Sequence, residues 1–170
     1  VFGQCPVMTS FLYLMSTKNL LYLLIKVPCN NVSLNFILYK YYPNMKKANK
    51  KLNAAIVIIG NEILSGRTQD VNVLNISNWL NKLGIKLEEV RVIPDVEKTI
   101  VETINEVRKK FTYVFTTGGI GPTHDDITSK SISKAFNVQY CYHPEAYKIL
   151  ENYYDKGKFN VGRRKMAKTP

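Results

Sequence analysis

Cysteine and histidine are scarce in this chain of 170 residues, with three cysteines and two histidines. The cysteines Cys5, Cys29 and Cys141 are odd in number and widely spaced, and no C-x-x-C motif is present. Neither a disulfide framework nor a structural zinc site is therefore expected. We interpret Cys141 as a small core or strand residue in a reducing compartment, and we expect a cytoplasmic location.

The sequence motifs of several enzyme classes are also missing. The absence of G-x-S-x-G excludes the nucleophile elbow of serine hydrolases. There is no Walker A sequence, and no G-x-G-x-x-G follows the first expected strand, so standard P-loop and dehydrogenase interpretations fit poorly. The apolar run at residues 20–25 is far shorter than the ~20 residues that span a bilayer, and no membrane partner is expected.

Acidic residues are absent from residues 1–44, which are rich in Leu, Tyr, Asn, Phe and Ile without helical or strand periodicity. Three interpretations compete for this segment. It is a signal peptide, although it lacks a clean small-residue cleavage site; it is a membrane-associating leader; or it lies outside the functional protein, which then starts at Met45. We favour the third, because residues 45–51 resemble a polar N-terminus that leads directly into a buried strand.

The composition that is present fits one soluble globular domain, with 45% hydrophobic and 22% charged residues. A net charge of +11 raises the alternative of nucleic-acid binding. The basic residues are spread over residues 46–51, 108–110 and 163–168, however, and no nucleic-acid motif accompanies them. We therefore expect no specific nucleic-acid partner, and a basic field that attracts a small anionic substrate.

Strands and helices alternate from residue 54 onward. Apolar, β-branched runs predict strands at residues 54–59, 86–93 and 113–117, and a further short strand at residues 138–142. Apolar residues at helical spacing predict helices at residues 71–83, 96–110, 127–136 and 144–154. This alternation predicts an α/β fold with a parallel sheet covered on both faces.

A glycine-rich loop follows the third strand and is the strongest functional signal. Parallel α/β folds bind ligands beyond the carboxyl ends of their strands, and glycines there present backbone N–H groups to phosphates. The positive end of the following helix favours the same ligand. A plain turn is the alternative, but this loop joins a buried strand to a helix and precedes two carboxylates. We predict ligand contacts at Thr116, Thr117, Gly118, Gly119, Gly121, Pro122 and Thr123.

Paired carboxylates, Asp125 and Asp126, follow this loop. One of them is expected to cap the next helix. Two carboxylates beside a phosphate site repel an anion unless a cation intervenes, which predicts a divalent metal such as magnesium or manganese. Asp126 is the better candidate for the metal and Asp125 supports it, while the neighbouring His124 is a weaker candidate for a phosphate contact.

The loops after the first two strands also carry polar residues. Asp95 follows the second strand, and the loop after the first strand offers Glu62, Ser65, Asp70 and Asn72 as ligand contacts. Asp70 and Asp95 are equally suited to cap the helices that follow them. Because three successive strand ends deliver such loops to one edge of the sheet, we expect an active site there.

These motifs resemble the MoaB/Mog molybdopterin-binding domain family, and most closely its CinA-like branch. The resemblance covers residues 52–170 and rests on Gly-Asn-Glu-Ile-Leu-Ser-Gly at residues 60–66 and on the long stretch at residues 116–128. It implies a three-layer α/β/α fold with a mostly parallel sheet, often oligomeric. It also implies that Gly60 and Asn61 belong to the ligand site and that Asp95 and Asp126 are the catalytic carboxylates.

The resemblance also implies a function. Domains of the CinA-like branch are associated with metal-dependent pyrophosphatase activity on substrates such as ADP-ribose, and the doubled aspartate is shared with a domain of some FAD synthases. We therefore expect a metal-dependent nucleotide pyrophosphatase that takes a small nucleotide or pterin. The alternatives are adenylylation of molybdopterin in molybdenum cofactor biosynthesis and a binding module or decayed fragment without turnover.

One departure from the family concerns residues 166–170. In the family, a similar Met-Ala…Pro segment is followed by a glycine-containing loop, further strand and helix, and often an amidohydrolase domain. None of these follows here. We therefore expect a fold that is incomplete at its C-terminus, which favours the binding module.

Overall fold

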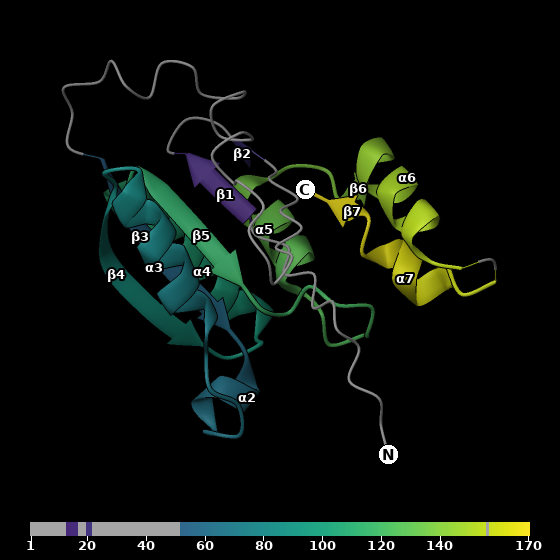
Figure 1. The fold of residues 1–170 in the computed structure, drawn as a ribbon, viewed down its shortest axis with the longest axis horizontal. Coiled ribbons are helices and arrows are strands. Elements are labelled where there is room, and N and C mark those ends of the chain that lie inside the picture. The colour runs from purple at the N-terminus through teal and green to yellow at the C-terminus, as the bar shows by residue number, and fades with distance from the viewer. Residues whose placement is uncertain (1–12, 17–19, 22–51, 156) are drawn as a thin grey trace.

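The structure is a computed structural model, and it describes residues 13–16, 20–21, 52–155 and 157–170 of the chain (Figure 1). Three parallel strands form the centre of the main sheet: β3 (Asn53–Ile59), β4 (Lys86–Ile93) and β5 (Tyr113–Thr117). β3 lies between the other two, with Ile56 in register with Val90 on one side and Phe115 on the other.

Two short strands extend the sheet beyond β5. β1 (Tyr13–Ser16) pairs antiparallel with β5, and β2 (Leu20–Leu21) pairs antiparallel with β1, which gives the order β2-β1-β5-β3-β4. These residues belong to residues 1–44, the segment without strand periodicity that we expected to lie outside the functional protein. The remainder of residues 1–44 lies outside the described residues, so the proposed domain boundary stays a prediction.

Alternate residues of β3 face two separate hydrophobic layers. Ala54, Ile56 and Ile58 pack with α3 (Asn72–Lys82) on one face of the sheet. Ala55, Val57 and Ile59 pack on the other face with α4 (Glu97–Lys110) and α5 (Thr128–Phe136). A strand that is buried on both faces reads as a continuous apolar run, as residues 54–59 do. The predicted three-layer α/β/α fold is therefore confirmed.

The boundaries of the predicted strands and helices agree closely with the structure, with one exception. The strand expected at residues 138–142 is reduced to β6 (Cys141–Tyr142), which pairs with β7 (Lys168–Thr169) and not with the main sheet. Cys141 is exposed. Its interpretation as a strand residue is correct and its interpretation as a core residue is wrong, because no other described element covers Cys141 in this two-stranded sheet.

The C-terminal unit consists of β6, α6 (Pro144–Tyr153), α7 (Val161–Lys165) and β7, and it lies beside α5 (Figure 1). It has a small core of its own, formed by Ala146, Leu150 and Ala167. None of the helices in the described part of the chain combines the length and apolar composition that a bilayer crossing requires.

Candidate functional site

The carboxyl ends of the three parallel strands meet at one edge of the sheet, as the sequence predicts. There, the Gly60 N–H donates to the carbonyl oxygen of Ile93 (3.1 Å). The Asn61 N–H, at the start of α2 (Asn61–Leu64), donates to Asp95 Oδ2 (2.9 Å). Asp95 therefore joins the loops after β3 and β4. It does not cap α4, whose first turn has no side-chain cap, so that alternative is wrong.

Two glycines bring the loop after β5 against its neighbours. Gly118 has φ +94°, and a Cβ at this position would lie 1.9 Å from the carbonyl oxygen of Ile59. Gly119 has φ +60°, and its Cβ would lie 2.4 Å from Thr128 Oγ1 and 3.2 Å from Asp95 Oδ1. No L-side chain fits these contacts without displacing backbone or buried atoms. The glycines thus allow the β5 loop to approach the ends of β3 and β4.

Thr128 closes the two ends of this loop, and the sequence analysis missed it. The residue is fully buried, and its Oγ1 donates to the carbonyl oxygen of Gly118 (2.8 Å). Its N–H donates to the carbonyl oxygen of Gly119 (3.0 Å). A threonine in the first turn of a helix is common, so nothing in the sequence distinguishes this one.

Asp126 holds the loop together from within. Its Oδ2 accepts hydrogen bonds from the N–H (2.7 Å) and the Oγ1 (2.6 Å) of Thr123. α5 begins only at Thr128, and its N-cap Ile127 makes no side-chain cap. The expectation that one aspartate of the pair caps this helix is therefore wrong, because both precede it.

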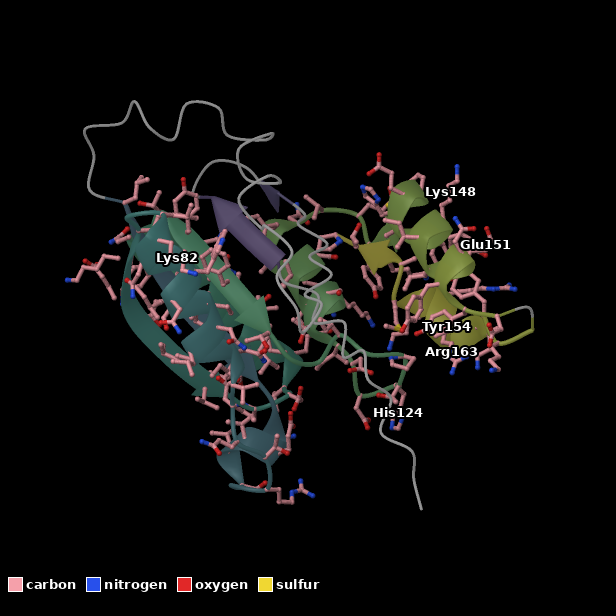
Figure 2. The ribbon with its side chains drawn as sticks, viewed as in Figure 1. Lys82, His124, Lys148, Glu151, Tyr154 and Arg163 are labelled. Atoms are coloured by element: carbon pink, nitrogen blue, oxygen red, sulfur yellow. The ribbon has the colours of Figure 1, made fainter. Side chains whose placement is uncertain are left out.

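A cavity of about 440 Å³ opens between the three loops. Its lining combines three carboxylates with three nitrogen-bearing side chains and includes Asn61, Glu62, Arg67, Asp95, His124, Asp125 and Ile127. Asp125, rather than Asp126, is the member of the pair that lines it. Asp125 Oδ1 contacts His124 Nε2 (2.7 Å), and both side chains are largely exposed. His124 is labelled in Figure 2.

Arg67 is a lining residue that the sequence analysis did not select. Its Nε donates to Ser65 Oγ (3.0 Å), and no carboxylate among the described residues forms an ion pair with it. The guanidinium is thus available to an anion in the cavity. One feature of the sequence could have indicated Arg67: it is a basic residue in a loop at a strand end whose other side chains are acidic or neutral.

Other predicted ligand contacts hold the loops instead of lining the cavity. Asp70 Oδ1 accepts from the Val73 N–H (2.8 Å) at the first turn of α3, which confirms the capping alternative for Asp70. Asn72 Nδ2 donates to Thr117 Oγ1 (2.8 Å). Thr116 is buried, and its Oγ1 has no hydrogen-bond partner among the described residues.

The carboxylates in the cavity do not form a metal site by themselves among the described residues. In the described part of the chain, no three His, Cys, Asp or Glu side chains cluster closely enough to hold a metal ion. Magnesium is often held by one or two carboxylates together with substrate phosphates. Asp95 and Asp125 both line the cavity, and a metal held by them together with substrate phosphates stays a prediction.

Known proteins that are similar to this chain match it over the α/β fold and the loops that form the cavity. The family described as "Probable molybdopterin binding domain" matches residues 55–169. A putative competence-damage inducible protein of Pediococcus pentosaceus is 37% identical over 105 residues, covering 62% of this chain and 25% of that protein. A probable FAD synthase of Caenorhabditis briggsae is 36% identical over 113 residues, covering 64% of this chain and 22% of that protein. The chain thus spans about a quarter of the length of these two relatives.

Among solved structures, the protein CinA of unknown function from Thermoplasma acidophilum superimposes with a TM-score of 0.65 at 31% identity, and 72% of each chain is covered. The family match extends over the β3, β4 and β5 loops that form the cavity. The chain therefore belongs to the MoaB/Mog molybdopterin-binding domain family and is CinA-like.

Proposed function

We propose that the cavity binds a nucleotide or pterin diphosphate and that the protein hydrolyses the pyrophosphate bond with the help of a divalent metal. The observation that carries this proposal is the placement of Asp95, Asp125 and Arg67 around one cavity beside the glycine loop. The name of one relative, probable FAD synthase, refers to FAD, whose two nucleotides are joined by a diphosphate.

The β5 loop supplies groups that suit a diphosphate. Gly118 and Gly119 both have positive φ, which lets the backbone of this loop fold closely against the ends of β3 and β4 beside the cavity. α5 follows the loop and is nine residues long, so its N-terminal end carries a partial positive charge. Arg67 adds a full positive charge from the opposite loop, and its fork of donors matches phosphate oxygens.

The carboxylates divide into two roles. Asp95 and Asp125 would hold the metal together with the diphosphate oxygens, and Asp126 keeps Thr123 and the loop in position. A bound magnesium or manganese would neutralise the developing charge and supply an activated water. This differs from the expectation that Asp126 is the principal metal ligand, since both donors of Thr123 already occupy one of its oxygens.

A binding module for molybdopterin or a nucleotide is the second candidate. It is favoured by the lack, among the described residues, of a carboxylate or histidine cluster that holds a metal without substrate. Under this alternative, the same loop binds phosphate and no bond is broken.

The test uses the full chain with ADP-ribose, FAD or ATP, with and without manganese or magnesium, while AMP release is measured. Metal-dependent release is expected, and Asp95→Asn and Asp125→Asn should each reduce it about 100-fold, the scale on which loss of one stabilising group acts. Asp155→Asn is the matched control, because Asp155 is an exposed carboxylate that pairs with Lys158 in the C-terminal unit.

The outcomes separate the candidates. No AMP release from protein that is folded by circular dichroism and binds ADP in calorimetry supports the binding module. Adenylylated molybdopterin formed from ATP supports transfer in place of hydrolysis. Folded protein that neither releases AMP nor binds ADP or molybdopterin contradicts both candidates.

A further inference from the structure

The C-terminal unit makes a direct contact with the β5 loop through Lys165 of α7. The Lys165 ammonium donates to the carbonyl oxygen of Thr123 (2.6 Å) and to that of Asp126 (3.1 Å). These two carbonyls are the ends of a four-residue turn whose inner residues are His124 and Asp125. One side chain therefore ties both ends of the turn that presents His124 and Asp125 to the cavity.

Gly162 makes a second contact from the same face of α7. A Cβ at Gly162 would lie 3.0 Å from the carbonyl oxygen of Pro122, so the helix packs closely against the residue that precedes the turn. Residues three apart lie on the same side of a helix, which places Gly162 and Lys165 on one contact surface. The close approach allowed by Gly162 brings the Lys165 ammonium within reach of both carbonyls.

α7 is itself held by the C-terminal unit. Its N-terminus is capped by Asn160 Oδ1, which accepts from the Arg163 N–H (3.0 Å). Ala167 follows α7, is fully buried with Ala146 and Leu150, and accepts from the His143 N–H (2.9 Å). The unit therefore provides a fixed support from which Lys165 reaches the loop.

We propose that Lys165 is a positioning residue that holds the Thr123–Asp126 turn in the conformation that presents Asp125 and His124 to the cavity. Lys165 does not line the cavity, and its ammonium is already bonded to two carbonyls, so it acts through the loop and not on the ligand. The consequence for substrate rests on the proposed function, whereas the effect on the loop does not.

Hydrogen exchange of the full chain without ligand tests the effect on the loop. In Lys165→Met, which keeps the aliphatic stem and removes the donors, exchange in residues 118–127 is expected to become about ten times faster or more. Exchange in β3 and β5 should stay unchanged. Lys165→Arg should restore protection, because a guanidinium can donate to both carbonyls.

Lys148→Met is the matched control. Lys148 is an exposed lysine of α6 in the same unit, and it lies far from His124 in the view of Figure 2. It should leave loop exchange unchanged. If Lys165→Met does not fold, Gly162→Ala replaces it, because the added Cβ separates α7 from Pro122 and should likewise accelerate exchange in the loop.

Kinetics test the consequence for substrate. In Lys165→Met, the KM for ADP-ribose should rise about tenfold with a smaller change in kcat, since the loop binds the diphosphate before the bond breaks. Unchanged loop exchange in both Lys165→Met and Gly162→Ala overturns the proposal, as does equal acceleration in loop and sheet. Absence of AMP release from the unsubstituted protein defeats the proposed function alone, because the exchange result still decides the role of Lys165.

Discussion

The loops after β5 and after β3 border the same cavity but are held in different ways. The β5 loop is tied by Thr128 at its base, by Asp126 within and by Lys165 from the C-terminal unit. The β3 loop is exposed over residues 64–69 and has mostly local hydrogen bonds, such as that from the Thr68 N–H to the carbonyl oxygen of Glu62 (3.2 Å).

This difference indicates a division of work between the two loops. A backbone that binds phosphate must be fixed before the ligand arrives, because ordering it on binding would reduce the affinity. The β3 loop contributes the long side chains of Glu62 and Arg67 to the cavity. Such a loop tolerates more backbone motion, because a long side chain can still reach the ligand. Substitutions in the two loops test whether the β5 loop is the more rigid of the pair.

The largest effect is expected for Gly118→Ala. The Cβ would lie 1.9 Å from the Ile59 carbonyl oxygen at φ +94°, so strain and steric overlap combine. The free energy of unfolding should fall by about 3 kcal/mol or more, measured by urea denaturation.

Gly66→Ala in the β3 loop is its control. Gly66 has φ +72°, but no atom lies within 4 Å of the added Cβ. Only the backbone preference is lost, which costs about 1 kcal/mol. Equal losses for the two variants would show that the β5 loop is no more constrained than the β3 loop.

Thr128→Val should have the next largest effect. It preserves the shape of a buried side chain and removes the donor to the Gly118 carbonyl, which should cost about 1–2 kcal/mol of unfolding free energy. Ser65→Ala removes an exposed hydroxyl of the β3 loop and should change stability by less than about 0.5 kcal/mol. A similar response of both variants in thermal denaturation contradicts the proposed rigidity of the β5 loop.

Arg67→Gln should alter binding and leave stability unchanged. Its guanidinium makes only a hydrogen bond to Ser65 Oγ in the described structure, so the fold does not depend on it. Calorimetry should show about tenfold weaker binding of ADP, the scale of one charge-assisted hydrogen bond. Lys109→Gln removes the same charge on α4, away from the cavity lining, and should leave ADP binding intact.

The smallest effect is expected for Glu106→Gln, which is remote from both loops. Hydrogen bonds from Arg91 and then Lys110 lower the pKa of Glu106 from 4.5 to about 2. The stabilisation is present above about pH 4.5 and is lost as the pH falls toward 2. Because the carboxylate is exposed, the variant should melt only slightly lower at pH 7, and the difference should vanish near pH 2. A difference that grows on acidification would contradict this assignment.

The sheet and its helices were predictable because the spacing of apolar residues along each segment indicates which of its faces are buried. The run at residues 54–59 predicted a strand buried on both faces, and Lys86–Ile93 and Tyr113–Thr117 have the predicted limits. The roles of Asp125 and Asp126 were less predictable. They are adjacent and chemically identical, and only the path of the loop directs one toward Thr123 and the other toward the cavity.

The fold of this protein could be predicted from local sequence patterns, whereas the arrangement of its site depends on tertiary contacts. Local apolar periodicity was enough to predict the α/β class and the three parallel strands whose loops meet at one edge of the sheet. The freedom of the glycine backbone was enough to predict a close approach in the loop after β5. Tertiary structure decided which carboxylates share the cavity and that Arg67 lines it. It also decided that Lys165, 39 residues beyond Asp126, supports the loop. Such contacts join distant segments, and no local pattern records them.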